Sequence, residues 1–366
     1  MLFVLMSIAC TGGEAEPGEP ALEGVAALGH QSNSLADLSV EVFAGSAEGL
    51  DRPLDLEFNP DKPGELWIVN QDDDSTTVLF GAGESDQSSR HDVDPFALHF
   101  MEEVSSIAFG APGTFGTCQE SRNTYNGQGQ PNDFMGPALW SSDFEIYAKT
   151  NPEAEAYLNY DLGSHLDMLH ESPLCMGIAW EKDNVYWAFD GGNATLARYD
   201  FQADHGPGYD DHSDGIVAKY VIGEISRVEG VPSHMVYDGA SGLLYVADTG
   251  NNRIAVLDTN TGERGRTLQA SEPGVDQFEM INASFETLID GAEYGLGEPS
   301  GLALVNGLIY VSDFATGNLF AFELDGDLLD WAPTERPGIA GIEVVDEKEL
   351  WVVDSQANEA IRILAD

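Results

Sequence analysis

Leu244 to Asp258, LYVADTGNNRIAVLD, is the stretch that decides the fold, because its aromatic-x-x-Asp core recurs along the chain. Residues two apart in a strand point to the same face, so YVAD predicts a strand that is apolar on both faces. The closing Asp favours a tight turn, and the alternating IAVLD after it completes a hairpin. Six such cores run from an aromatic residue to Asp or Asn: Trp67–Asn70, Trp140–Asp143, Trp187–Asp190, Tyr245–Asp248, Tyr310–Asp313 and Trp351–Asp354.

The spacing of these cores predicts an architecture. Repeats of roughly 40 to 50 residues are typical of propeller blades, because a single four-stranded sheet buries both faces only when neighbours stack on it in a ring. The six cores therefore predict an all-β, six-bladed β-propeller over residues 37–366. Residues 38–43, LSVEVF, alternate like a strand without a blade of their own. We expect this N-terminal strand to complete the last blade and close the ring.

The stretch LYVADTGNNRIAVLD resembles the NHL repeat, with Asp248, Asn252 and Arg253 at the positions that the pattern of that family uses. The other cores keep the aromatic residue and the Asp or Asn but lack the Asn/Arg pair, so the resemblance covers the propeller in architecture only. Propellers of this type include peptidyl-hydroxyglycine lyases, lactonase-like enzymes and binding modules. The resemblance therefore implies a fold and leaves the function open.

The composition is strongly acidic, with 64 Asp and Glu against 15 Lys and Arg and a formal net charge of −49. Nucleic acid is disfavoured as a partner, because phosphate binding relies on clustered Lys and Arg. The excess exceeds what solubility alone requires, and we interpret it as adaptation to a salty medium, with plain solubility as the alternative.

This interpretation predicts that the melting temperature rises from low salt to molar NaCl, since salt screens the repulsion between like surface charges. Thermal unfolding at several NaCl concentrations tests it. A melting temperature that does not rise would contradict the halophilic interpretation.

The N-terminus resembles a bacterial lipoprotein signal: residues 1–10, MLFVLMSIAC, are apolar and place Cys10 after the small Ala9. The segment lacks a basic start and is shorter than the ~15 to 30 residues usual for a signal, so a frayed apolar terminus is the alternative. We expect residues 1–9 to be a signal segment, Cys10 to carry lipid, and residues 10–36 to form a flexible acidic linker. This predicts a cell-envelope protein, periplasmic or extracellular, with the lipid anchor as its only membrane contact.

The two remaining cysteines, Cys118 and Cys175, invite a disulfide in an oxidising compartment. The strand assignment places Cys118 in a loop after the first strand of blade 2 and Cys175 just before the first strand of blade 3. These positions lie at opposite faces of the disc, so the pairing stays open at this point.

Two insertions interrupt the regular blades. We assign residues 110–137 to a connection between the first two strands of blade 2, and residues 202–215 to a connection between the outer strands of blade 3. Both connections lie on one face of the ring in neighbouring blades, so they can form one lobe.

The second insertion, QADHGPGYDDHSDG, carries a candidate cation loop. Asp210, His212 and Asp214 imitate the first half of a calcium-loop pattern, but Val221 stands where the closing Glu belongs. Participation of His205 and His212 would favour a transition metal, and a solvated polar loop is the alternative. Further oxygen donors in reach are Asp204 and Asp211.

Ligand sites in propellers lie where the inner strands begin, because only there do all blades converge on one volume. Aligning those strand starts gives Asp55, Ser106, Gly177, His234, Gly301 and Gly341. Asp55 of blade 1 and His234 of blade 4 face each other across a sixfold ring. A carboxylate and an imidazole in one cavity can act as an acid/base pair, and we name them as candidate catalytic residues.

Further histidines precede the inner strands. His99 lies before blade 2, and the loop 163–176 before blade 3 carries His165, Asp167, His170 and Glu171. Three histidines suffice for zinc with one open position. We therefore predict a metal site at the channel mouth from His99, His170 and His234, with structural hydrogen-bonded imidazoles as the alternative.

Two classes of function follow from these candidates, and pure scaffolding through the side of the disc or residues 110–137 stays open as a third. The first is a lipid-anchored propeller that binds a small molecule, peptide or protein at its channel mouth, with zinc, copper or calcium as the accompanying ion. The alternative is a metal-dependent lyase or hydrolase that uses His234 and Asp55. The sequence contains no phosphate loop and no nucleophile elbow, so it selects no substrate class.

Overall fold

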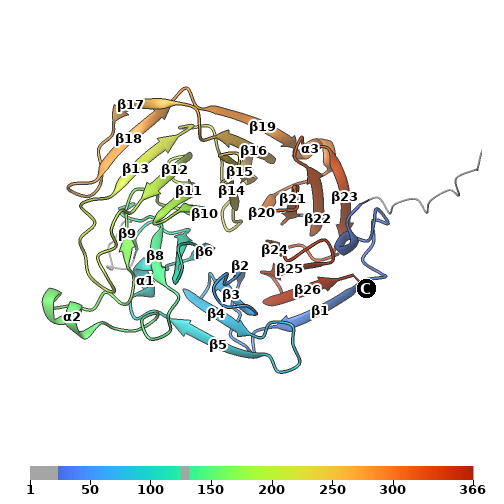
Figure 1. Cartoon of the computed structure of the whole chain (residues 1–366), viewed down its shortest axis with the longest axis horizontal. Coiled ribbons are helices and arrows are strands. Elements are labelled where there is room, and N and C mark those ends of the chain that lie inside the picture. The colour runs from blue at the N-terminus through green and yellow to red at the C-terminus, as the bar shows by residue number, and fades with distance from the viewer. Residues whose placement is uncertain (1–23, 125–131, 366) are drawn as a thin grey trace, which may run out of the picture.

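The computed structural model describes residues 24–124 and 132–365, and in it six sheets form a ring (Figure 1). This is the predicted six-bladed β-propeller. We call the region around the axis of this ring, between the six innermost strands, the channel. We call the end of the ring at which the innermost strands begin the mouth face.

The first three blades hold the sites discussed below. Blade 1 consists of β2 (Pro53–Phe58), β3 (Glu65–Asn70), β4 (Ser75–Phe80) and β5 (Ser88–Val93). Blade 2 consists of β6 (Val104–Phe109), β7 (Thr114–Gln119), β8 (Ala138–Ser141) and β9 (Asp167–Met168). Blade 3 begins with β10 (Cys175–Lys182), β11 (Val185–Asp190), β12 (Thr195–Asp200) and β13 (Ile216–Tyr220). Short helices α1 (Ala97–Phe100) and α2 (Pro152–Leu158) lie in the connections.

The other three blades complete the ring. Blade 4 consists of β14 (Met235–Asp238), β15 (Leu243–Asp248), β16 (Arg253–Asp258) and β19 (Ser284–Asp290), with the 3-10 turn η2 (Thr249–Asn251). Helix α3 (Gly291–Tyr294) leads to blade 5, which consists of β20 (Pro299–Val305), β21 (Leu308–Asp313), β22 (Asn318–Glu323) and β23 (Leu328–Pro333). Blade 6 consists of β24 (Ile339–Val344), β25 (Glu349–Asp354), β26 (Glu359–Leu364) and the N-terminal β1 (Ser39–Ala44).

The aromatic residues of the repeat pack between blades. Trp67, Trp187 and Trp351 lie on the second strands of their blades and are fully buried. The Trp67 ring contacts Phe109 and Phe115 of blade 2, with ring centroids 5.8 and 4.9 Å apart. Stacking the sheets therefore buries the faces that the repeat leaves apolar.

Strand β1 closes the ring as predicted. It pairs antiparallel with β26, from Ser39 opposite Leu364 to Ala44 opposite Ala360. The closure joins the two ends of the described chain in one sheet, so unfolding of blade 6 opens the ring at its first and last strands.

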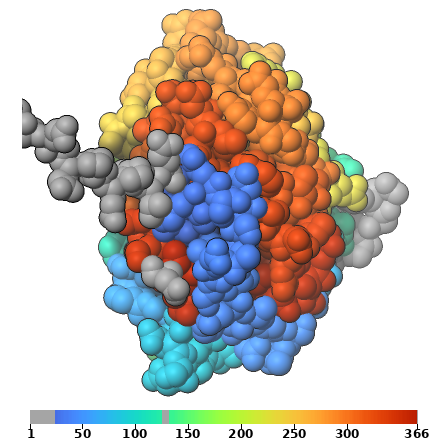
Figure 2. Space-filling view, turned by 90° about the vertical axis from the view of Figure 1, so that its right-hand side faces the viewer, coloured from blue at the N-terminus to red at the C-terminus, as the bar shows by residue number. Residues whose placement is uncertain are grey.

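Residues 24–36, which we expected to belong to the flexible linker, pack onto the propeller. The 3-10 turn η1 (Ala26–Leu28) buries Leu28 in a hydrophobic cluster shared with blades 5 and 6. The buried Asp330 carboxylate accepts the backbone N–H of Val25 at 2.8 Å. Figure 2 shows this segment, in blue, lying across the outer surface between segments of the C-terminal blades. The expected signal segment, Cys10 and the first part of the linker lie outside the described residues.

Strand β7 lies inside residues 110–137, which we predicted to be an insertion. The sequence TFGTCQ lacks the closing Asp and contains Gly116, so it reads as a loop. In the structure that glycine is required by packing, because a Cβ atom there would lie 2.8 Å from Ile178 and 3.0 Å from Tyr186 of blade 3. The true connection runs over residues 120–137, and Trp140 belongs to the third strand rather than the second.

Blade 4 carries a hairpin that we did not predict. Strands β17 (Glu263–Thr267) and β18 (Asp276–Ile281) leave blade 4 between β16 and β19 and extend the sheet of blade 3, where β18 pairs in parallel with β13. In β18 the apolar Phe278 and Met280 flank the charged Glu279, while β17, ERGRT, carries three charged residues and no large apolar one. Both strands fit an exposed outer sheet edge. The hairpin fastens blades 3 and 4 together at their rims.

Cys118 and Cys175 form a disulfide between blades 2 and 3, with Cα atoms 5.2 Å apart. The strand assignment placed them at opposite faces because it read Cys118 as part of a loop. Cys118 instead ends the ascending strand β7, which returns to the mouth face where β10 begins at Cys175. The two thiols therefore meet at the same face.

Among the described residues, no helix has the length and apolar character needed to cross a bilayer.

Candidate functional site

Asp55 and His234 lie in the channel close to its mouth, on or beside the first strands of blades 1 and 4. His234 Nε2 is 3.4 Å from Asp55 Oδ2, and the two residues are 5% and 8% exposed. Asp55 also accepts the backbone N–H groups of Leu56 and Ile107 at 2.9 and 3.0 Å. The sixfold ring thus brings together two side chains that are far apart in the sequence.

Burial sets the charge of this pair. Desolvation raises the pKa of Asp55 to about 8, against the effect of its two backbone hydrogen bonds. Desolvation lowers the pKa of His234 to about 4. Both groups are therefore neutral at pH 7, and their 3.4 Å contact is not an ion pair.

Two more carboxyl groups line the channel beyond Asp55. Burial, and then the neighbouring Asp55, raise the pKa of Glu343 to about 8, and burial also raises the pKa of Glu57. Glu57 accepts the backbone N–H of Phe109 at 2.7 Å. The channel is consequently an acidic, proton-holding interior.

The predicted set His99, His170 and His234 is only partly assembled. His99 Nε2 and His170 Nε2 are 3.1 Å apart, but the His234 imidazole contacts Asp55 and the Ser105 carbonyl instead. The reason is geometric: His99 lies on α1 and His170 follows β9, outside the ring of inner strands, whereas His234 lies at the axis. His234 is therefore separate from this histidine pair.

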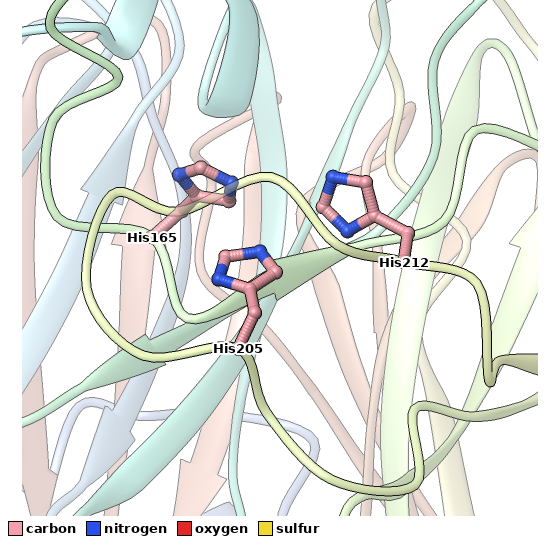
Figure 3. Close-up of side chains that lie close together, drawn as sticks. All are labelled: His165, His205 and His212. Carbon is pink, nitrogen blue, oxygen red and sulfur yellow. The ribbon is translucent and has the colours of Figure 1, made fainter. Parts of the chain in front are cut away.

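A larger histidine cluster lies beside blades 2 and 3. His165, His205 and His212 each place one ring nitrogen within 4.8 Å of the others (Figure 3). The rings of His205 and His212 are 4.8 Å apart between centroids, and those of His165 and His205 are 4.9 Å apart. His165 precedes β9, and the other two come from the loop between β12 and β13.

The loop is held against blade 2 by its backbone. The His205 N–H donates to the Leu166 carbonyl at 3.1 Å, and the Gly208 N–H donates to the His165 carbonyl at 2.9 Å. The lobe that we expected from residues 110–137 and 202–215 is thus formed by the second loop with the segment that precedes β9. These contacts bring His205 to His165.

In His165 and His205, one ring nitrogen contacts a backbone carbonyl oxygen, as is common in histidines that bind a metal ion. His165 Nδ1 lies 3.0 Å from the Leu162 carbonyl oxygen, and His205 Nδ1 lies 2.7 Å from the Gly206 carbonyl oxygen. If each Nδ1 carries the proton, each Nε2 presents a lone pair. Both Nε2 atoms are buried, and neither has a hydrogen-bond partner among the described residues. Backbone carbonyls behind one nitrogen commonly orient the other toward a metal.

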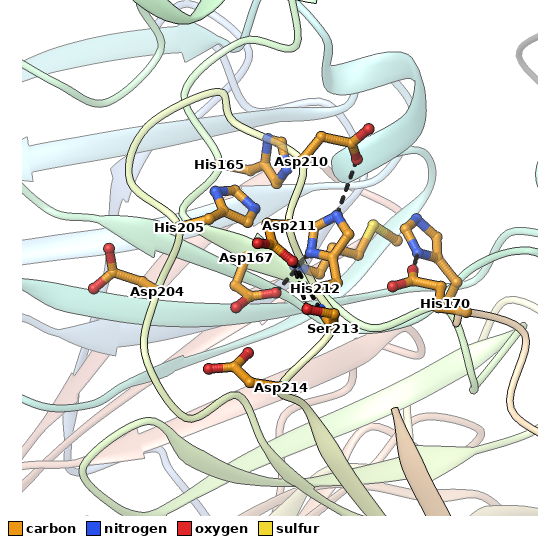
Figure 4. A network of polar contacts seen from close by, with 12 residues as sticks. His165, Asp167, His170, Asp204, His205, Asp210, Asp211, His212, Ser213 and Asp214 are labelled. Atoms are coloured by element: carbon orange, nitrogen blue, oxygen red, sulfur yellow. Dashed lines mark hydrogen bonds and ion pairs between the residues drawn. The ribbon is translucent and has the colours of Figure 1, made fainter. Parts of the chain in front are cut away.

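His212 supplies the third imidazole and lies between two carboxylates (Figure 4). Its Nδ1 is 2.8 Å from Asp167 Oδ1, and its Nε2 is 3.2 Å from Asp210 Oδ1. Asp167 and Asp210 therefore contact the two different nitrogens of the ring and fix its orientation. Three imidazole nitrogens and one carboxylate oxygen are a donor set suited to zinc or another transition metal.

Burial and neighbouring charges shift the pKa values of the three imidazoles in different directions. Desolvation lowers the pKa of His205 to about 4 and that of His165 well below its usual value, so both imidazoles are neutral. Burial also acts against the charge on His212, but its hydrogen bonds with Asp167 and Asp210 prevail and raise its pKa to about 10. A divalent ion that binds here replaces the His212 proton as the positive charge beside the two carboxylates.

The other loop carboxylates lie outside this donor set. Asp214 Oδ2 accepts the Ala203 N–H at 3.3 Å, Asp211 accepts from Ser213, and Asp204 accepts from Gly206. Asp204 and Asp211 each cap a local turn, whereas Asp214 joins two parts of the loop that lie 11 residues apart in the sequence. Asp210 and His212 are the members of the predicted cation loop that join the histidine cluster, and its imidazole donors favour a transition metal over calcium.

A cavity of about 1700 Å³ opens at the mouth face over blades 1 to 4. Its wall includes His170 and Glu171 but not Asp55 or His234. The five basic residues of the wall already have acidic partners, as in Arg227 with Glu120 at 2.6 Å and Lys219 with Asp190 at 2.6 Å. Eight acidic residues line the same wall: Asp72, Asp74, Glu102, Glu103, Glu120, Asp133, Glu171 and Glu229. The cavity therefore suits a polar ligand that is neutral or cationic.

Solved structures share the fold of this chain. A luciferin-regenerating enzyme is similar with a TM-score of 0.53 at 15% identity, covering 89% of this chain and 95% of that one. An auxiliary nutrient binding protein from Bacteroides ovatus has a TM-score of 0.54 at 12% identity, covering 90% and 77%. A calcium-binding protein, regucalcin, from Agrobacterium tumefaciens has a TM-score of 0.50 at 12% identity, covering 90% and 95%. No protein-family model and no curated protein sequence matches the chain. At these identities the likeness establishes the six-bladed β-propeller and nothing finer.

Proposed function

We propose that this chain is a metal-holding binding protein: a lipid-anchored, extracytoplasmic propeller that takes a polar ligand in its mouth cavity and holds zinc or copper on His165, His205 and His212. The observation that carries the metal proposal is the pair of buried Nε2 atoms on His165 and His205, which lack partners among the described residues although their Nδ1 atoms are engaged. Leaving two buried acceptors unsatisfied costs about 1 to 3 kcal/mol each, and a metal ion removes that cost.

The ion has a structural role in this proposal. It joins the segment before β9 in blade 2 to the loop between β12 and β13 in blade 3, next to the cavity wall. Metal binding then stabilises the folded state by an amount set by the ion concentration relative to its dissociation constant, about 2.7 kcal/mol at a hundredfold excess.

The zinc content of purified protein tests the metal proposal. After incubation with zinc and removal of free ion, we expect His205→Gln to retain one equivalent less than the wild type, because one of three imidazole ligands is lost. His91→Gln is the matched control, since His91 pairs with Asp73 in blade 1, away from the cluster. Equal zinc content in His205→Gln and the wild type would contradict the site.

A ligand in the mouth cavity is supported by the size and polarity of the cavity and by the propeller fold that this chain shares with the nutrient binding protein. Lipid attachment at Cys10 is supported only by the sequence MLFVLMSIAC and is tested by lipid labelling of the wild type against Cys10→Ala in a bacterial host. An unlabelled wild type would remove the anchor from the proposal.

The alternative is a lyase or hydrolase that uses Asp55 and His234. The opposite pKa shifts of the two groups favour it, because acid and base catalysis need such separated values. It requires substrate to reach two buried side chains, and turnover that survives in both Asp55→Asn and His234→Gln would exclude it.

A further inference from the structure

The histidine cluster extends past His212 toward the mouth cavity. His99 Nε2 and His170 Nε2 face each other at 3.1 Å, and the His170 ring lies 5.7 Å from that of His212 between centroids. With zinc–nitrogen bonds of about 2.0 to 2.1 Å, two imidazole ligands of one tetrahedral ion lie roughly 3.3 Å apart. The His99–His170 contact is close to the spacing that a shared ion requires.

Neighbouring residues fix the orientation of His170 through its other ring nitrogen and its ring face, as is common for imidazoles that bind a metal ion. His170 Nδ1 contacts the Glu272 carboxylate, which comes from the hairpin that blade 4 contributes to blade 3. The His170 ring also stacks on Phe134, with centroids 3.8 Å apart. A carboxylate behind Nδ1 orients the ring and directs Nε2 toward a ligand position.

The pair also differs from the first site in its access. His165, His205 and His212 do not line the mouth cavity, whereas His170 does. His99 is not part of the cavity wall, so an ion between the two Nε2 atoms would lie at the edge of the cavity. There, water or an oxygen atom of the bound ligand could complete its coordination.

We propose that His99 and His170 hold a second transition-metal ion at the edge of the mouth cavity, beside the ion on His165, His205 and His212. The proposal deepens the proposed function, because it joins the metal centre to the ligand cavity. It assigns Glu272 the role of a positioning residue, since its carboxylate acts through His170.

The metal content of matched variants tests the second ion. Using zinc or cobalt alone as the probe, we expect two equivalents in the wild type, one in His99→Gln, one in His205→Gln and none in the double variant. His91→Gln should retain two. Melting curves of the metal-free variants confirm that each is folded, and His170→Gln replaces His99→Gln if the latter is not.

Release kinetics supply a readout that needs no variant. With a colorimetric chelator in excess, the wild type should lose one equivalent quickly from the cavity edge and one slowly from the buried site, and His99→Gln should lose the fast phase.

The outcomes separate the two proposals. One equivalent in the wild type that disappears in both His99→Gln and His205→Gln means a single ion shared by the cluster, and it overturns the second position. Loss in His99→Gln with no change in His205→Gln supports the cavity-edge ion and overturns the buried one. Unchanged content in His99→Gln and in His170→Gln overturns the second ion whatever His205→Gln shows.

Discussion

Removal of the Cys118–Cys175 disulfide is expected to lower the free energy of unfolding on the order of 4 kcal/mol. The bond closes a loop with a sequence separation of 57 residues, and the chain-entropy relation for a loop of that length gives this value. Because the entropy of unfolding grows with chain length, a change of this size in a chain of 366 residues lowers the melting temperature by about 5 °C. Chemical unfolding of Cys118→Ala/Cys175→Ala against the oxidised wild type measures it.

The control for this prediction uses one sequence in two redox states. Both cysteines are fully buried, so the alanine variant also loses packing. When the wild type and the alanine variant are both unfolded in the presence of a strong reductant, neither has a disulfide. The difference in their free energies of unfolding then contains only the loss of packing, and the entropic contribution of the disulfide is absent. An oxidised wild type that is no more stable than the reduced one would show that the disulfide does not stabilise this fold.

The ring of six sheets was predictable because the sequence pattern that specifies each blade is short and is repeated along the chain. A core such as Tyr245–Asp248 specifies a strand that is apolar on both faces and ends in a turn, and six copies leave a ring of stacked sheets as the arrangement that buries them. The same symmetry placed Asp55 opposite His234, because strand starts occupy equivalent positions in every blade.

The departures from the repeat were not predictable in this way. Strand β7 has neither the closing Asp nor an uninterrupted apolar run, and the need for Gly116 appears only when Tyr186 of the next blade is in place. The hairpin of β17 and β18 belongs to blade 4 in sequence but to blade 3 in hydrogen bonding. Pairing across blades leaves no periodic signal in the sequence.

The grouping of the histidines also could not be predicted from the sequence. His165 and His170 precede the first strand of blade 3 and His205 and His212 lie in a later loop, so the residue types were visible but their grouping was not. Their convergence depends on backbone contacts such as His205 N–H to the Leu166 carbonyl. The sequence therefore showed the histidines but grouped His234 with His99 and His170, whereas its imidazole contacts Asp55 and the Ser105 carbonyl.

The acidity of the channel leads to a pH dependence of stability that can be assigned to Asp55. Its pKa is raised to about 8 in the folded protein, from an ordinary value of 3.8. A raised carboxyl pKa means that the unfolded chain loses this proton first, so stability falls as pH rises from about 4 to 8. His234 has the opposite effect below its ordinary value of 6.5, because its folded pKa is lowered to about 4. The two slopes cancel below pH 6.5, and between pH 6.5 and 8 His234 no longer opposes Asp55. Glu343, whose pKa is also raised to about 8, adds a slope of the same sign, so the contribution of Asp55 is read as the difference between the wild type and Asp55→Asn.

In that window we expect the wild type to lose about 2 kcal/mol of stability relative to Asp55→Asn, at about 1.4 kcal/mol per pH unit for one proton. Asparagine keeps an oxygen that can accept the Leu56 N–H but cannot ionise in the buried site. Unfolding curves at several pH values in molar salt isolate this term, because salt screens the repulsion among the many surface carboxylates. The matched control is Asp86→Asn at an exposed position, whose curve should run parallel to the wild type. If Asp55→Asn also runs parallel, Asp55 is ionised in the folded protein and its contact with His234 is an ion pair, which would reverse the charge assignment of the channel.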